Sequence, residues 1–142
     1  MADDPIEIER TIPSDLAEVR RIQNEVKDAL EARRYGERDM FHIELALEEA
    51  LVNAIKHGNQ LDLTKVVRVR CVVSEALFEI RIEDQGTGFD PIDIPDPTLP
   101  ENWERTCGRG IHLIRNFMTS VEYVGRGNVV TMSKLRNGTA SE

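Results

Sequence analysis

Three short groups of residues have the types and the spacing that a binding or catalytic site needs. The first is Glu49-x-x-x-Asn53, which lies in a stretch without proline whose only glycine stands at its end. Such a stretch predicts a helix that begins near Asp39 and stops at Gly58. Residues four apart share one face of a helix, so the Glu49 carboxylate and the Asn53 amide should project side by side.

The faces of this predicted helix favour the floor of a pocket. At ~100° per residue, Glu49 and Asn53 fall with His42 on a polar strip roughly 40° wide that has apolar margins. Glu48 points elsewhere, so Glu48-Glu49 is not a pair of catalytic carboxylates. A narrow solvated surface is the alternative interpretation. The opposite face is apolar, as packing on a core requires, and consists of Ile43, Leu47, Ala50, Leu51 and Ala54.

The second group is Asp84-x-Gly86-x-Gly88, which follows a predicted buried strand. It places a carboxylate at the end of a sheet, where the glycines allow positive φ and the close approach of a ligand. An ordinary turn is the competing interpretation of this pattern.

The third group, Gly108-Arg109-Gly110, opens a short predicted helix. Free N–H groups at a helix start, beside an arginine, are suited to binding phosphate, although a plain loop-to-helix junction has the same pattern. Neither glycine pair completes a dinucleotide fingerprint, because the third glycine position holds Pro91 or Leu113, and the chain has no P-loop motif.

The composition limits the class of protein. The 142 residues are expected to form one domain over 1–136, followed by a flexible tail at 137–142. The net charge of −8 is spread along the chain and argues against a nucleic-acid or membrane surface. No apolar run approaches the ~20 residues of a membrane span, and no secretory signal precedes the first strand, so a cytoplasmic location is expected. Cys71 and Cys107 do not form a metal cluster with only three histidines.

Hydrophobic periodicity predicts the remaining elements. Pro13 should end the first strand, and Ser14 should cap the helix that follows it. The segment 90–107 is expected to be a long irregular loop. Helices against one side of the strands predict an α+β two-layer sandwich with a mostly antiparallel mixed sheet. The predicted strands are 6–12, 65–73, 77–83, 120–124 and 129–135, and the predicted helices are 16–30, 39–58 and 111–118.

In this order and spacing, the three groups resemble the N, G1 and G2 boxes of the GHKL ATPase superfamily. The resemblance extends over nearly the whole chain. It is closest to the short, free-standing members that act as anti-sigma factors and serine protein kinases, as the run from Glu49 to Gly58 suggests. It implies a Bergerat-type ATP-binding fold in which ATP is held under a lid at about 90–107.

The resemblance also implies roles for individual residues. Asn53 would coordinate Mg²⁺ through its side-chain oxygen, and Glu49 would act as general base toward the attacking hydroxyl. Asp84 would accept a hydrogen bond from the adenine amino group of ATP. Gly86 and Gly88 would shape the wall of the pocket.

At the third group, Gly108, Arg109 and Gly110 would meet the phosphates, and Ile111 would complete the nucleotide-binding set. One position departs from the family. Relatives often place a threonine after the glycine of the last hairpin, where this chain has Asn128. An asparagine can make a similar polar contact.

The function implied by the resemblance is that of an ATP- and Mg²⁺-dependent serine kinase acting on an anti-anti-sigma (STAS-domain) protein. The same protein would bind a sigma factor or a similar regulator and would work as a homodimer, without direct nucleic-acid or membrane partners. Two alternatives stay open. One is a partner-switching regulator that binds ATP with little or no kinase activity, and the other is a detached histidine-kinase-type catalytic domain.

Overall fold

The computed structural model describes residues 4–86, 118–124 and 128–136. Several of the predicted features lie outside these ranges. They are Gly88, the loop and proposed lid at 90–107, the group 108–111, the helix at 111–118 except Met118, and the tail at 137–142.

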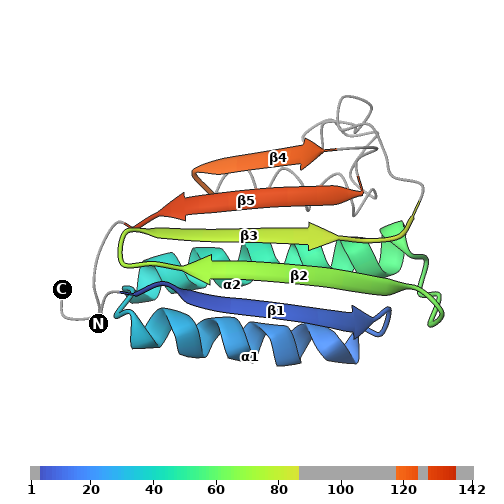
Figure 1. Ribbon diagram of the computed structural model, residues 1–142, viewed down its shortest axis with the longest axis horizontal. Helices are drawn as coiled ribbons and strands as arrows, with labels where there is room; N and C mark the ends of the chain where they lie inside the picture. Colours follow the sequence, from blue (N-terminus) through green and yellow to red (C-terminus); the bar gives the residue numbers. More distant parts are fainter. Residues whose placement is uncertain (1–3, 87–117, 125–127, 137–142) are drawn as a thin grey trace, which may run out of the picture.

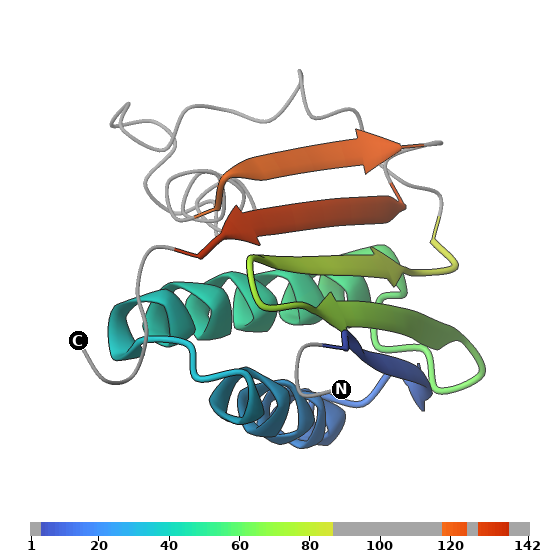
Figure 2. The ribbon, with the colours of Figure 1, turned by 60° about the vertical axis from the view of Figure 1, so that its left-hand side comes forward.

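The described residues form an α+β structure built on a five-stranded sheet. Its elements are β1 (Ile6–Pro13), α1 (Ala17–Ala32), α2 (Glu37–Val52), η1 (Asn53–Gly58), β2 (Val66–Val73), β3 (Leu77–Glu83), β4 (Ser120–Val124) and β5 (Val129–Leu135). The strand order is β1-β2-β3-β5-β4, and every described pairing is antiparallel. Helices α1 and α2 lie together on one face of the sheet (Figures 1 and 2), which confirms the predicted two-layer architecture.

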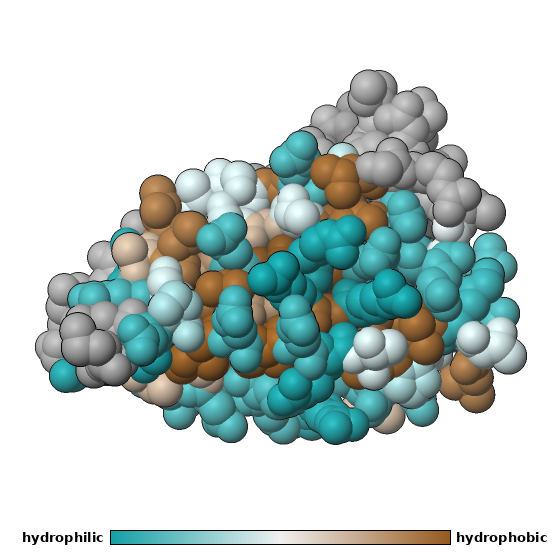
Figure 3. All heavy atoms as spheres, viewed as in Figure 1, coloured by the Kyte–Doolittle hydropathy of each residue, from teal (hydrophilic) through white to brown (hydrophobic). Residues whose placement is uncertain are grey.

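Each strand turns one side into the core, because side chains alternate across a pleated strand. In β3, Phe78, Ile80 and Ile82 are at most 2% exposed, whereas Glu79 and Arg81 lie in solvent. Hydrophilic side chains accordingly predominate over the strands on the open face of the sheet (Figure 3). Because the helices cover only one face of the sheet, the pairing register of each strand is specified. A slip of one residue would expose the apolar side chains and bury the polar ones.

The start of α1 differs from the prediction, because Ser14 is not its cap. The Ser14 side chain is buried, and its hydroxyl donates to the Lys65 carbonyl oxygen at 2.8 Å. The Asp15 carboxylate instead accepts a hydrogen bond from the Ala17 N–H at 2.9 Å. It thereby satisfies one of the free N–H groups that every helix start presents.

The second helix combines an α-helix and a π-helix. Helix α2 begins slightly before the predicted start, and from Asn53 the chain continues as the π-helical segment η1 to the predicted end at Gly58. Leu47 and Leu51 are 0% exposed on the inner face of α2, and such burial contributes about 1.5–3 kcal/mol for each side chain. Turns of a π-helix are wider, so faces assigned at ~100° per residue do not extend beyond Asn53. None of the described helices is long and apolar enough to cross a membrane.

Candidate functional site

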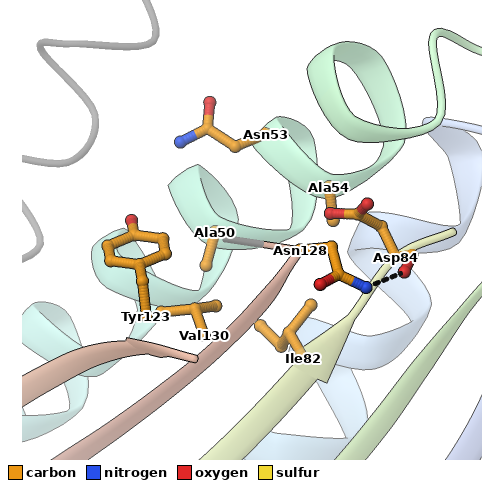
Figure 4. A pocket seen from close by; sticks show the side chains of 8 residues that line it. All are labelled: Ala50, Asn53, Ala54, Ile82, Asp84, Tyr123, Asn128 and Val130. Carbon is orange, nitrogen blue, oxygen red and sulfur yellow. Dashed lines mark hydrogen bonds between the residues drawn. The ribbon is translucent and has the colours of Figure 1, made fainter. Parts of the chain in front are cut away.

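A pocket lies between the C-terminal part of the second helix and one end of the sheet (Figure 4). It brings Asn53, the first residue of η1, to the same cavity as Asp84, which directly follows β3. Two of the predicted site residues, distant in the sequence, therefore border one pocket. The lining consists of Ala50, Asn53, Ala54, Ile82, Asp84, Tyr123, Asn128 and Val130.

Asp84 is nearly buried, with 7% of its surface exposed, and is held through its backbone. Its N–H donates to the Asn128 carbonyl oxygen at 2.9 Å, and the Asn128 side-chain amide donates to the Asp84 carbonyl oxygen at 3.1 Å. Its carboxylate Oδ1 accepts from the Gly86 N–H at 2.8 Å. Within the described part of the chain, no hydrogen bond reaches Oδ2, so this oxygen is available to a donor on a ligand.

Burial also changes the chemistry of this carboxylate. Desolvation raises the pKa of Asp84, and the hydrogen bond from the Gly86 N–H offsets this effect only in part. The ionised carboxylate is therefore poorly solvated in the folded protein. A donor group on a ligand would relieve that desolvation.

The Asp84 carboxylate lies against the end of the helix at a place where only glycine fits. A Cβ added to Gly58 would stand 2.4 Å from atoms of the Asp84 carboxylate, and one added to Gly86 would stand 2.0 Å from the Gly58 carbonyl oxygen. Any side chain at either position would displace its neighbour. Gly86, which the resemblance assigns to the pocket wall, needs to be glycine for this reason.

Glu48 and Glu49 lie in unlike surroundings although they are adjacent. Glu48 is exposed and Glu49 is half-buried. The Asn53 N–H bonds to the Glu49 carbonyl oxygen, so these two residues are one helical turn apart. Burial, and to a lesser extent the Glu48 charge, raises the pKa of Glu49. A carboxylate with a raised pKa is a stronger base, although Glu49 itself does not line the pocket.

Asn53 stands at the rim of the pocket with its amide directed away from Asp84 (Figure 4). Its side chain has no hydrogen-bond partner among the described residues. The described ranges also contain no group of three or more His, Cys, Asp or Glu that could hold a metal ion. Mg²⁺ bound with a nucleotide needs only one or two protein oxygens, because phosphates and water supply the rest. A single amide at the rim therefore fits such an ion.

The sequence patterns do not indicate every residue that builds the site. Tyr123 lines the pocket from β4, where the pattern predicts only a strand. Asn59 is completely buried, and its side chain bonds to three separate chain segments. Asn128 uses its side-chain amide to hold the backbone of Asp84. The one available signal for Asn59 is its place directly after a helix-ending glycine, where polar residues are ordinarily solvated.

The fold and the pocket define an α+β domain with a binding site between a helix and the end of an antiparallel sheet. Residues 12–134 match the family described as the histidine kinase-like ATPase domain. The chain belongs to this family, and the predicted GHKL-type ATPase is thereby confirmed.

Individual relatives agree with the class of regulator predicted from the sequence. The chain is 34% identical over 102 residues to an anti-sigma F factor of Oceanobacillus iheyensis, covering 68% of this chain and 69% of that protein. It is 33% identical over 110 residues to the serine-protein kinase RsbW of Bacillus licheniformis, covering 72% and 69%.

Among solved structures, the RsbU and RsbW domains of Rv1364c from Mycobacterium tuberculosis have a similar fold. The TM-score is 0.63 at 15% sequence identity, over 96% of this chain. The present chain spans only 34% of that larger protein. At this identity the likeness establishes the fold alone.

Proposed function

We propose that this chain is an ATP- and Mg²⁺-dependent serine protein kinase that phosphorylates an anti-anti-sigma (STAS-domain) protein and acts as an anti-sigma factor. The observation that carries the proposal is the meeting of Asn53 and Asp84 at one pocket, with the half-buried Glu49 one helical turn away. The relatives named anti-sigma F factor and serine-protein kinase support the class of reaction and of partner.

The adenine of ATP is proposed to lie against Asp84. Its exocyclic amino group is a donor, and Oδ2 of Asp84 is an acceptor without a partner among the described residues. Ile82 and Val130 line the same pocket and offer apolar contacts to the ring. A guanine presents a carbonyl oxygen where adenine has its amino group, and the carboxylate would repel it.

Asn53 is proposed to coordinate Mg²⁺ through its side-chain oxygen at the pocket rim. When bound, Mg²⁺ neutralises charge on the phosphates of the nucleotide. The residues 108–111 and Gly88 are proposed as further nucleotide contacts, and 90–107 as the lid. These segments lie outside the described residues, and their assignment rests on the resemblance.

Glu49 is proposed as the general base that accepts the proton of the attacking serine hydroxyl. Burial raises the pKa of Glu49, and the ionised form of a carboxylate with a raised pKa is a stronger base. Its position one turn before Asn53 would place the base beside the phosphate end of the nucleotide. Phosphoryl transfer depends mainly on positioning and charge stabilisation, so the Asn53 contact should matter as much as the base.

The protein is further proposed to act in the cytoplasm as a homodimer that binds a sigma factor or a similar regulator when it is not engaged with its STAS substrate. The names of the anti-sigma relatives support a regulator of this kind. Phosphorylation of the STAS partner would change which of the two proteins is bound.

The test is single-turnover transfer of radiolabelled phosphate from ATP to a cognate STAS protein, analysed by the acid stability of the product. Acid-stable phosphoserine on the STAS protein supports the proposal. Acid-labile phosphohistidine would identify a histidine-kinase-type catalytic domain instead. Nucleotide binding without transfer would identify a regulator that uses ATP only to change its conformation.

A further inference from the structure

We infer that Asn59 is a positioning residue for nucleotide recognition: its buried side-chain amide fixes the segment 84–86 against the helix end and thereby maintains the preference for adenine over guanine. This inference rests on the proposed function, because Asp84 discriminates between bases only if a purine nucleotide occupies the pocket.

The hydrogen bonds of Asn59 join four parts of the fold. The residue is 0% exposed and directly follows η1. Its Nδ2 donates to Ser14 Oγ at 2.9 Å and to the Val66 carbonyl oxygen at 3.0 Å, while its Oδ1 accepts from the Gln85 N–H at 2.7 Å. Its own N–H donates to the Ala54 carbonyl oxygen at 2.8 Å. One side chain thus connects the helix end with the β1–α1 connection, the start of β2 and the end of β3.

The bond to Gln85 is the one that concerns the nucleotide. Gln85 follows Asp84 directly, so Asp84 is held on one side through Asn128 and on the other through Asn59. The Gln85 side chain also accepts from the Val66 N–H at 2.8 Å, which closes a ring of hydrogen bonds around the amide. Hydrogen bonds at Asp84 and at Gln85 therefore fix the position of the backbone that carries the Asp84 carboxylate.

The helix end is the reference against which this carboxylate is placed. The space left by the missing side chain of Gly58 is filled by the Asp84 carboxylate, whose atoms would stand 2.4 Å from a Cβ there. Asn59, next in the chain, binds the residue next to Asp84. The pair Gly58-Asn59 therefore sets how the adenine-binding carboxylate stands relative to the helix that carries Asn53.

Loss of this constraint should reduce selectivity more than affinity. A hydrogen bond weakens steeply with distance and angle, so a displaced Asp84 contributes little to the choice of base. The apolar contacts from Ile82 and Val130 do not distinguish adenine from guanine. They would be retained.

The experiment compares dissociation constants for Mg-ATP and Mg-GTP in the full chain and in matched variants, with the melting temperature of each recorded without nucleotide. Asn59→Ala should reduce the preference for ATP over GTP by about tenfold or more. Ser14→Ala removes bonds of the same network that involve Asn59 and Lys65 but not residues 84–86, and it should lower the melting temperature while keeping the preference for ATP. Asn59→Asp keeps an oxygen that can accept from the Gln85 N–H. This variant should therefore also keep the preference for ATP, although it should be less stable.

Each outcome decides the inference. An unchanged preference in Asn59→Ala, or an equal loss in Ser14→Ala, would overturn it, because Asn59 would then act only through general stability. If Asn59→Ala does not fold, Asn59→Ser replaces it in the same comparison, since its shorter hydroxyl cannot span to both Val66 and Gln85. Asp84→Asn separates the two proposals: if that variant keeps the wild-type preference for ATP, the proposed adenine contact itself has failed.

Discussion

Gly86 and Gly58 are in direct backbone contact: a Cβ on residue 86 would stand 2.0 Å from the Gly58 carbonyl oxygen. This contact joins the end of the helix that carries Asn53 to the segment that carries Asp84. The two halves of the proposed ATP site are thus placed by backbone packing as well as by hydrogen bonds. A substitution at either glycine should therefore disturb the pocket without removing any group that binds the ligand.

Gly86→Ala and Gly58→Ala should each weaken ATP binding by about tenfold or more. The added methyl group must push the chain apart, and overpacking of this kind also costs about 1–3 kcal/mol of stability. Isothermal titration with Mg-ATP measures the first effect and thermal unfolding the second. Gly36→Ala is the matched control, since Gly36 has an ordinary φ of −70° at the start of α2. Wild-type affinity in both test variants would show that the close contact is not needed for the pocket.

Asp84→Asn should abolish most of the rise in melting temperature that ATP produces. In the wild type, saturation at a hundred times Kd corresponds to about 2.7 kcal/mol. Asparagine keeps an oxygen for the Gly86 N–H but is a weaker acceptor for the adenine amino group. A mutant that keeps the full ATP-dependent rise would remove Asp84 from the site.

The same variant should be as stable as the wild type, or more so, without nucleotide. Because burial raises the pKa of Asp84, the folded state favours the protonated carboxyl relative to the unfolded state. The stability contributed by that proton is present at low pH and is lost as pH rises through the raised pKa. Above the raised pKa, the ionised Asp84 therefore destabilises the folded state, and asparagine avoids this cost. Thermal unfolding of both proteins at pH 7 checks this sign.

The sequence predicts those parts of the fold that depend on local periodicity. The run rich in β-branched residues predicts β3 with its observed bounds. The helical spacing of the apolar residues places Ile43 and Leu47 in the core, as observed. The same helical phase predicts that Glu48 points elsewhere than Glu49, and the two side chains do differ in burial. These features depend only on which residues of one element face the same way.

Features that depend on contacts between distant segments are not predicted. Ser14 has the chemistry of a helix cap, but its hydroxyl bonds to Lys65, far along the chain. The place of Asn59 after a helix-ending glycine does not predict its burial, because its side-chain partners come from three other segments. A hydrophobic pattern with a period of 3.6 residues likewise does not predict the π-helical turn that begins at Asn53. The pairing of Asn53 with Asp84 is expected from family resemblance, and no local rule predicts it.

The rate of phosphate transfer should fall on the acid side with a midpoint above the ordinary glutamate pKa of 4.5, because burial raises the pKa of Glu49. Only the ionised carboxylate accepts a proton, so activity is lost as pH falls through the raised value. Single-turnover rates at saturating ATP across the acidic range measure this midpoint. ATP affinity must be followed in parallel, since Asp84 also titrates with a raised pKa. A rate that stays constant down to the ordinary glutamate range would contradict the assignment of Glu49 as base.

The last prediction separates Glu49 from Glu48, which have identical chemistry and differ in helical phase. Glu49→Gln should keep ATP binding but slow phosphate transfer by ~10²–10⁴, the range expected for losing a positioned base. Glu48→Gln is the matched control and should leave both quantities within a small factor, because this side chain is exposed.

A third variant tests the group one turn further along the same helix. Asn53→Ala should weaken the Mg²⁺-dependent part of ATP binding as well as transfer, because the amide oxygen at the pocket rim is the proposed metal ligand. Single-turnover phosphorylation of the STAS partner, with nucleotide affinity measured with and without Mg²⁺, distinguishes the three variants. If Glu48→Gln is the inactive variant and Glu49→Gln the mild one, the base is not on the face of the helix that leads to Asn53. The proposed placement of the reacting serine beside this helix would then be wrong, whatever the affinity for ATP.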